Sequence, residues 1–309
     1  MSNQALIDEL LSSINMHKHF GENTAHVEIH GNKVLGSTLV KGLTIDVDEK
    51  SVGIDANLRV ERGYKLDNPV HLCFGMIPED GIQKINLNVL IEEDADADFL
   101  AHCTFPNAVD VQHLMDAHIE VQPNGRYAYF ERHVHGEHGG LKVVPKAKIV
   151  LHEHAYFSTE FELLKGRVGL IDIDYETEAK AYSTLEMKAR ISGREDDRIN
   201  IRETAVLSGE YATGVLISHI ALRDNAYAEI YNDLRAEAPH ARGHVDCKEI
   251  VQGNGVARAV PIVQVNDPQA HVTHEAAIGA VDSKQLQTLM SRGLDEEEAV
   301  ELIIDGLLK

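Results

Sequence analysis

Apolar and polar residues alternate along most of this chain, and a two-residue period is typical of half-buried β-strands. The alternation is clear at Leu43, Ile45 and Val47, and again at Ile85, Leu87, Val89 and Ile91. It continues through HIEVQPNGRYAYFERH, AKIVLHEHAYF, VGLIDIDYETEA, GVLISHIALRD and AYAEIYNDLRAEA, and Pro123-Asn124-Gly125 is a turn signal in the first of these segments. The pattern predicts a strand about every 15 to 25 residues from residue 26 onward.

These predicted strands leave little room for helices between them. A doubly wound α/β fold is excluded because it needs a helix between successive strands. Two all-β arrangements remain: a sandwich or barrel of antiparallel hairpins, or a β-helix whose turns stack in parallel. Tight Asn-Gly hairpins are scarce after residue 125, and Ala is frequent where tight coils favour small side chains. The sequence therefore favours a β-helix.

Helical patterns are found at the two ends of the chain. Near the start, the spacing of apolar residues predicts a short amphipathic helix over residues 3–17, with Leu6, Leu10, Leu11 and Ile14 on its apolar face. We therefore divide the chain into an N-terminal helical segment (1–25), a β-helix core (26–265) and a C-terminal helical segment (266–309).

Two helices are predicted in the C-terminal segment. Asp282 or Ser283 can cap the first helix, and Gly293 ends it. Its apolar face consists of Leu286, Leu289 and Met290. Asp295 and Glu298 form a capping box that opens the second helix. The apolar stripe of that helix consists of Ala299, Leu302, Ile303 and Leu307. Such a pair either packs on its own domain or presents an apolar face to a partner.

Charge and composition narrow the range of partners. The chain of 309 residues carries 29 Lys and Arg against 50 Asp and Glu, and its formal net charge is −21. This excess would repel nucleic acid and anionic lipid, and no basic patch reverses it, so we expect neither partner. No run reaches the ~20 apolar residues of a membrane span. The hydrophobic content of 43% includes few aromatic residues and no Trp, which predicts an aliphatic core.

The cysteines and the N-terminus indicate where the protein works. Cys73, Cys103 and Cys247 are widely separated and form neither a disulfide framework nor a CxxC pair. The N-terminus lacks the basic start and the cleavage site of a signal peptide. We therefore expect a soluble cytoplasmic protein.

Two histidine-containing segments suggest metal chemistry. In ERHVHGEHGG, His133 and His135 would share one face of a strand and, with a carboxylate, could hold a divalent metal as cupins do, although the spacing of Glu137 departs from the cupin arrangement. The segment HVTHEA is neither HExxH nor HxxEH, which gives zinc hydrolysis little support. In a helix or turn, His271, His274 and Glu275 would share a face, whereas in an extended strand His274 and Glu275 would point in opposite directions, and the spacing alone does not decide between the two.

The third segment, GHVDCKEIVQG, places Cys247 in a polar neighbourhood. His244 and Asp246 precede it, and an imidazolium favours the thiolate whereas a carboxylate disfavours it. A buried inert thiol is the plainer alternative. The sequence contains no GxxxxGK[ST] motif, so no nucleotide site is expected in this chain.

The order of these segments resembles the C-terminal part of the SufB/SufD family, the scaffold subunits of the SUF iron–sulfur cluster assembly machinery. The similarity rests on GHVDCKEIV followed by HVTHEAAIGAVDSKQLQTLMSRGLDEEEAVELIIDGLL. Upstream, HCTFPNAVDVQH and the strand-rich middle extend it over residues 85–309. The chain is shorter than a typical SufB and is similar to the compact scaffolds of minimal, archaeal-type SUF systems.

The resemblance implies a right-handed parallel β-helix whose C-terminal helices dock a SufC-like ABC-type ATPase. It implies no enzyme activity in this chain, but a transient iron–sulfur cluster, 4Fe–4S or 2Fe–2S, at the interface of a homodimer. Cys247 falls where SufB-type scaffolds carry the cysteine required for cluster building, and His274 and Glu275 fall on the HE pair of the family. A sulfur donor and apo-protein acceptors would be transient partners.

Three secondary candidate residues and two alternative functions remain beside the scaffold interpretation. Cys103 matches a family cysteine less closely, and His271 and His244 are neighbours of the site without an implied role. One alternative is a cupin-like divalent-metal enzyme using His133 and His135. The other is a metal-free SufD-like structural subunit.

Overall fold

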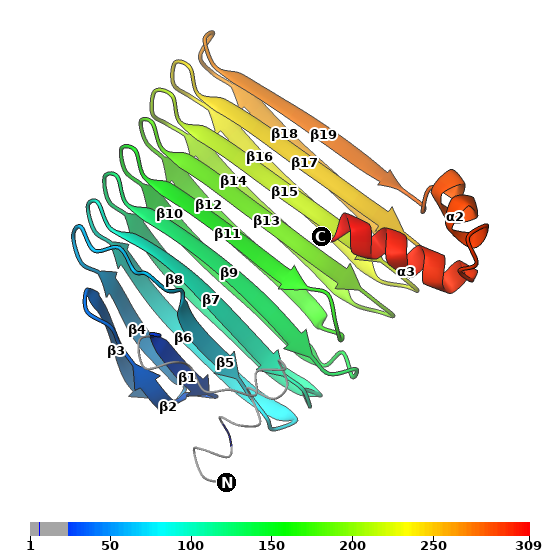
Figure 1. The fold of residues 1–309 in the computed structure, drawn as a ribbon, viewed down its shortest axis with the longest axis horizontal. Helices are drawn as coiled ribbons and strands as arrows, with labels where there is room; N and C mark the ends of the chain where they lie inside the picture. The colour runs from blue at the N-terminus through cyan, green and yellow to red at the C-terminus, as the bar shows by residue number, and fades with distance from the viewer. Residues whose placement is uncertain (1–5, 7–23) are drawn as a thin grey trace.

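A computed structural model describes Leu6 and residues 24–309, and its strands alternate between two facing sheets that wind into a β-solenoid of about eight turns (Figure 1). Sheet A holds β1 (His26–His30), β2 (Lys33–Thr38), β5 (Val70–Gly75), β7 (Asp96–Phe105), β9 (Arg126–His135), β11 (Tyr156–Leu163), β13 (Thr184–Gly193), β15 (Thr213–Leu222), β17 (Arg242–Val251) and β19 (His271–Gly279). Sheet B holds β3 (Leu43–Lys50), β4 (Gly53–Val60), β6 (Asp80–Ile91), β8 (Asp110–Val121), β10 (Leu141–Leu151), β12 (Gly169–Ala179), β14 (Arg198–Leu207), β16 (Tyr227–Ala236) and β18 (Val256–Val265). The predicted β-helix is confirmed. The predicted helix over residues 3–17 lies, apart from Leu6, outside the described residues.

Parallel ladders set the repeat of the solenoid. Tyr156 pairs with Thr184, Thr184 with Thr213, and Thr213 with Arg242, so a coil in this region takes 28 or 29 residues. Antiparallel pairs occur only at the N-terminal end of the described strands, between β1 and β2 and between β3 and β4. Because the register is kept, each inward side chain stacks on the residue at the same position of the coil before it.

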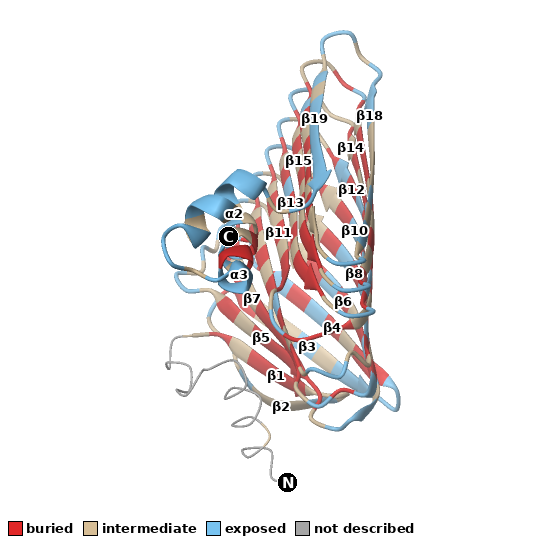
Figure 2. Ribbon diagram, turned by 90° about the vertical axis from the view of Figure 1, so that its right-hand side faces the viewer, coloured by how far each residue is buried: buried red, intermediate tan, exposed pale blue. Residues whose placement is uncertain are grey.

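Strand alternation separates the core from the surface. In β9, for example, every second residue from Tyr127 to His135 is buried, and the residues between them are at least partly exposed, which gives the striped strands of Figure 2. Aromatic rings fill part of the N-terminal half, where Tyr127 packs against Phe99 and Phe157 with ring centres 5.3 and 5.4 Å apart. Aliphatic side chains dominate the C-terminal half, in agreement with the predicted aliphatic core.

One corner of the solenoid needs a left-handed backbone in successive coils. Asn124 adopts φ 58° in the predicted Pro123-Asn124-Gly125 turn, which is thereby confirmed. Tyr182 and Tyr211 occupy the same corner two and three coils later, each with φ 59°. Such a φ is unfavourable for a bulky residue. The two rings stack with centres 5.2 Å apart, and this contact partly offsets the backbone cost.

Two helices follow the last strand, α2 (Ser283–Met290) and α3 (Glu296–Leu307). Both predicted caps are confirmed: Asp282 accepts a hydrogen bond from the Gln285 N–H, and Asp295 and Glu298 form a capping box. The helices begin at Ser283, so the segment 266–309 also contains β19. No helix within the described residues is long and apolar enough to cross a membrane.

Helix α3 lies across the outer face of sheet A (Figures 1 and 2). Val300, Ile304 and Leu308 are buried there against Ala221 of β15, with Ile250 of β17 beside them. The Arg190 side chain donates to the carbonyl of Leu308 at 2.5 Å, and Arg223 forms an ion pair with Glu301. Helix α3 therefore packs on its own domain.

The docked face of α3 differs from the predicted stripe. Ala299 is buried as expected, but Leu302 is 47% exposed, and Ile303 and Leu307 are only partly buried. The face that packs on the sheet instead carries Val300 and Ile304, which the predicted stripe did not include. Leu302 is left on the free side of the helix.

We predict that Ile304→Ala releases α3 from sheet A. The side chain is 2% exposed, and deleting it should cost the docked helix about 2 kcal/mol or more. Amide hydrogen exchange in residues 296–307 would then accelerate while β15 and β17 stay protected. Leu302→Ala on the exposed side of the same helix is the matched control. Equal exchange in both variants would contradict the docking.

Candidate functional site

Cys247 lies inside the last complete coil. It is fully buried on the inward face of β17, and its Sγ is 3.5 Å from the Nδ2 of Asn232, which reaches across from sheet B and also contacts the hydroxyl of Ser218 at 3.2 Å. Burial, followed by the charge of Glu249, raises the pKa of the Cys247 thiol to about 12. The side chain is therefore a neutral thiol in this state, and it must lose its proton before it can bind a metal.

Two buried carboxyl groups share this part of the interior. Glu249 follows Cys247 by two residues and lies on the same inward face, whereas Glu203 lies on β14 beside Asn232. Burial raises the pKa of Glu249 to about 7 and that of Glu203 to about 8. Within the described part of the chain, both oxygens of Glu249 and Oε2 of Glu203 are buried without a hydrogen-bond partner. Cys247, Asn232, Glu249 and Glu203 thus form a buried polar cluster that makes few of the hydrogen bonds it could make.

These neighbours were missed by the sequence analysis. Strand alternation alone would have placed Glu249 on the face of Cys247, because the two residues are two apart. Asn232 and Glu203 come from the opposite sheet, and no local signal connects them to Cys247.

The HE pair lies on β19, the terminal strand of sheet A. His274 pairs with Val245 and therefore continues the inward face, as a diagonal neighbour of Cys247 at about 8 Å between Cα atoms. Glu275 pairs with Asp246 on the outer face, where its carboxylate is 3.9 Å from the Nζ of Lys248. The structure thus brings Cys247 and His274 to one face and places Glu275 on the other.

The secondary residues of this region lie on the outer face as well. His244 is 2.8 Å from the hydroxyl of Thr273 through its Nδ1, and His271 is exposed on the same strand as Thr273. Neither side chain converges with Cys247.

A second polar cluster lies inside the N-terminal half and contains Cys103. The donor atoms of Cys103, Glu131 and His133 all lie within 4.8 Å of one another. The Glu131 carboxylate is 2.7 Å from Nε2 of His133 and 3.5 Å from Sγ of Cys103. Burial and the adjacent Glu131 raise the pKa of the Cys103 thiol well above its ordinary value. Burial opposes ionisation of Glu131, but the contacts with His133 hold its pKa below the ordinary value.

His133 and His135 do share an inward face, but they contact each other. His133 Nδ1 is 3.0 Å from His135 Nε2, and His135 Nδ1 is 3.1 Å from the carbonyl of Arg167. Burial lowers the pKa of His135 well below its ordinary value, so this ring is neutral. Its proton lies on Nδ1, which donates to the carbonyl, and its Nε2 accepts from His133. The carboxylate beside the pair is Glu131, whereas Glu137 is exposed.

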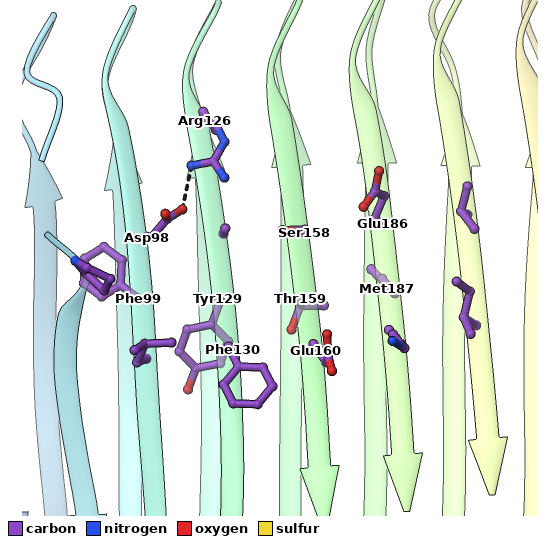
Figure 3. Close-up of a pocket in the computed structure, with 16 residues that line it drawn as sticks. Asp98, Phe99, Arg126, Tyr129, Phe130, Ser158, Thr159, Glu160, Glu186 and Met187 are labelled. Carbon is purple, nitrogen blue, oxygen red and sulfur yellow. Dashed lines mark hydrogen bonds and ion pairs between the residues drawn. The ribbon is translucent and has the colours of Figure 1, made fainter. Parts of the chain in front are cut away.

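A groove of about 580 Å³ lies on the outer face of sheet A (Figure 3). Three of its charged residues form ion pairs: Arg126 contacts Asp98 at 2.5 Å and Asp96 at 2.9 Å, and Glu160 pairs with Arg190. The groove contains none of the residues that the sequence marked as candidates. We therefore assign no chemistry to it.

The comparisons with known proteins agree with this architecture. Residues 77–307 match the family model described as SUF system FeS cluster assembly, SufBD core domain. An iron–sulfur cluster assembly SufBD family protein of Methanocaldococcus jannaschii is 34% identical over 310 residues, which cover 97% of this chain and 98% of that protein. One of Pyrococcus horikoshii is 36% identical over 289 residues, or 94% of this chain and 88% of that protein. Iron–sulfur cluster assembly protein SufB of Bacillus subtilis is 22% identical over 258 residues, or 81% of this chain and 54% of that protein.

The raised pKa of Glu203 predicts a pH-dependent stability. Burial holds the pKa of this carboxyl at about 8 in the folded state, whereas the unfolded chain ionises it near the ordinary pKa of 4.5. Between these values the unfolded state binds fewer protons, so the free energy of unfolding should fall as the pH rises. Glu203→Gln should therefore be more stable than wild type at pH 8 by on the order of 4 kcal/mol, and about equal to it at pH 4. Chemical denaturation at both pH values measures this difference, and a constant difference would contradict the assignment.

Proposed function

The chain belongs to the SufBD family of iron–sulfur cluster assembly proteins, and from this premise we propose that it is a scaffold on which a nascent cluster is built and from which it is transferred. One observation carries the proposal: Cys247 and His274 share the inward face of the last two strands of sheet A, at the end of the stack. A thiolate and a neutral imidazole are both ligands for iron. In this account, Cys247 anchors the cluster and His274 ligates beside it.

A single chain is a poor host for a cluster, because stable clusters usually take four thiolates and this site has one. The end of the stack supports a second copy as the missing partner. Strands β18 and β19 are the terminal strands of their sheets, and an unpaired strand edge is a template for pairing with another chain. Large apolar side chains are exposed on these strands, namely Val256, Val263, Val265 and Ile278. Two copies joined here around a two-fold axis would supply two Cys247 and two His274 to one cluster.

Carboxylates complete the proposed ligand set. Glu275 lies on the outer face of β19, but as part of a terminal strand it borders the same seam and can reach a cluster held between two copies. Mixed sulfur, nitrogen and oxygen ligation should hold a cluster less firmly than four thiolates, which suits a scaffold that releases its product. Glu249, buried next to Cys247, is a second carboxylate within this neighbourhood.

The C-terminal helices are the proposed docking site for a SufC-like ABC-type ATPase. Helix α2 buries none of its residues, and Met290 and Leu302 are exposed on α2 and α3. Helix α3 also contacts Ala221 of β15 and Ile250 of β17. A displacement of the helix would therefore be transmitted to β17, the strand that carries Cys247. Nucleotide-driven approach of two ATPases would thereby open or close the seam between the copies. Sulfur donors and apo-protein acceptors would meet the scaffold at that seam, in a reducing compartment.

Anaerobic reconstitution with iron and sulfide tests the proposed anchor. We expect wild type to gain the visible absorption and the Mössbauer spectrum of a cluster, Cys247→Ser to lose both, and His274→Ala to bind a cluster that is lost more rapidly. Cys73→Ser is the matched control, because Cys73 is a buried cysteine on β5 with no place in the site. Equal cluster content in wild type and Cys247→Ser would refute the anchor. Wild-type protein without iron or sulfide would instead indicate a structural subunit.

A further inference from the structure

The cluster of Cys103, Glu131 and His133 is separate from the proposed assembly site. In sheet A, five strand spacings of about 4.8 Å separate the strands of Cys103 and Cys247, or roughly 24 Å. Each of the three side chains is at most 2% exposed, inside the solenoid. The proposed scaffold function uses none of them as a cluster ligand.

A fourth polar side chain faces this cluster from sheet B. His113 of β8 is 1% exposed, and the centre of its ring is 5.9 Å from that of His133. Its Nδ1 is 2.9 Å from Oε1 of Gln83. The amide nitrogen of Gln83 donates to the carbonyls of Gly31 and Gly75, at 2.8 and 3.3 Å, which fixes the amide orientation.

This contact assigns the tautomer of His113. Because Oε1 of Gln83 only accepts hydrogen bonds, Nδ1 of His113 must carry the proton. Nε2 then keeps a free lone pair, and it is buried without a hydrogen-bond partner within the described residues. The ring that carries this lone pair lies 5.9 Å from the ring of His133, and the buried lone pair is the unexplained feature of this interior.

His133 is oriented in the same way. The carbonyl of Arg167 fixes the proton of His135 on Nδ1, and Nε2 of His135 fixes a proton on Nδ1 of His133. Nε2 of His133 therefore points at Glu131. In both rings Nδ1 donates to a held acceptor, which leaves Nε2 as the atom that can bind a metal, as is usual for histidines that bind metals.

We propose that Cys103, Glu131, His133 and His113 bind one divalent transition-metal ion, Zn²⁺ or Fe²⁺, in a tetrahedral site inside the solenoid. One thiolate, one carboxylate and two imidazoles are a ligand set for such ions. The two negative ligands balance the charge of the ion, so the occupied site carries no net charge, which a low-dielectric interior favours.

Three of the four donor atoms, those of Cys103, Glu131 and His133, already lie within 4.8 Å of one another, and the fourth ligand, His113, lies outside that group. Donor atoms about 2.0–2.3 Å from a tetrahedral ion lie roughly 3.3–3.7 Å apart. The 2.7 Å contact between Glu131 and His133 widens as the ion replaces the proton between them, and the His113 ring moves in from the opposite sheet. Loading also releases the proton of the Cys103 thiol. Because the cluster is enclosed, the ion enters as the chain folds.

Refolding the full chain anaerobically from guanidinium with equimolar Co²⁺ tests this proposal, since Co²⁺ reports on zinc-type sites. Wild type should show tetrahedral d–d bands, a thiolate-to-cobalt charge-transfer band and about one retained ion per chain. Cys103→Ala should abolish the charge-transfer band. His113→Gln should keep that band but weaken Co²⁺ binding roughly ten-fold or more. Added Zn²⁺ should displace Co²⁺ from wild type.

Cys73→Ala and Cys247→Ser are the controls and should both resemble wild type, which separates this site from the scaffold site. If Cys103→Ala does not refold, the weakened binding of His113→Gln still decides the matter. A wild type without a charge-transfer band, a band that survives Cys103→Ala, or affinity unchanged in His113→Gln would overturn the proposal.

Discussion

From β5 onward, each coil of this protein rests on the coil before it through a parallel hydrogen-bond ladder, and the register of that ladder decides which side chains meet inside. One inward column runs from Glu131 through Phe161, Ala189 and Ser218 to Cys247. A slip by one residue would exchange the inner and outer faces of every strand beyond it. The polar side chains of the interior are therefore positioned by the whole stack and by no single loop.

The stack also has to end, and its two ends differ. At the N-terminal end, the terminal strands β2 and β3 pair in antiparallel fashion with their neighbours. At the C-terminal end, β18 and β19 pair in parallel with theirs, and like β2 and β3 each leaves one edge without a partner strand among the described residues. Helix α3 lies on the face of sheet A and does not cover that end (Figure 2). The open end lies beside the buried thiol of Cys247 and the inward His274, which supports a function shared between two chains. A second copy could pair with the open strand edge and supply further ligands to the cluster.

Local sequence patterns were sufficient for much of this architecture. The two-residue period and the near absence of helices indicated a β-helix, and capping residues located both C-terminal helices. The spacing of His274 and Glu275 left a helix or turn and a strand open, and the observed strand sets the two side chains on opposite faces. Facing partners could not be predicted, because Asn232 and Glu203 approach Cys247 from another sheet. Likewise, nothing near Cys103 indicates His113, which approaches its cluster from the opposite sheet. Tyr182 and Tyr211 in left-handed corners were missed because the stacking that supports them is formed between coils.

The central claim is that one cluster is held by two chains at the open end. Native mass spectrometry of the anaerobically reconstituted protein measures this stoichiometry directly. The account predicts one cluster per pair of chains, and a cluster-free monomer for Ile278→Asp, whose side chain is exposed on the terminal strand. Val52→Asp, at an exposed apolar residue between β3 and β4, is the matched control and should behave as wild type. A cluster on monomeric wild type, or on monomeric Ile278→Asp, would contradict the account.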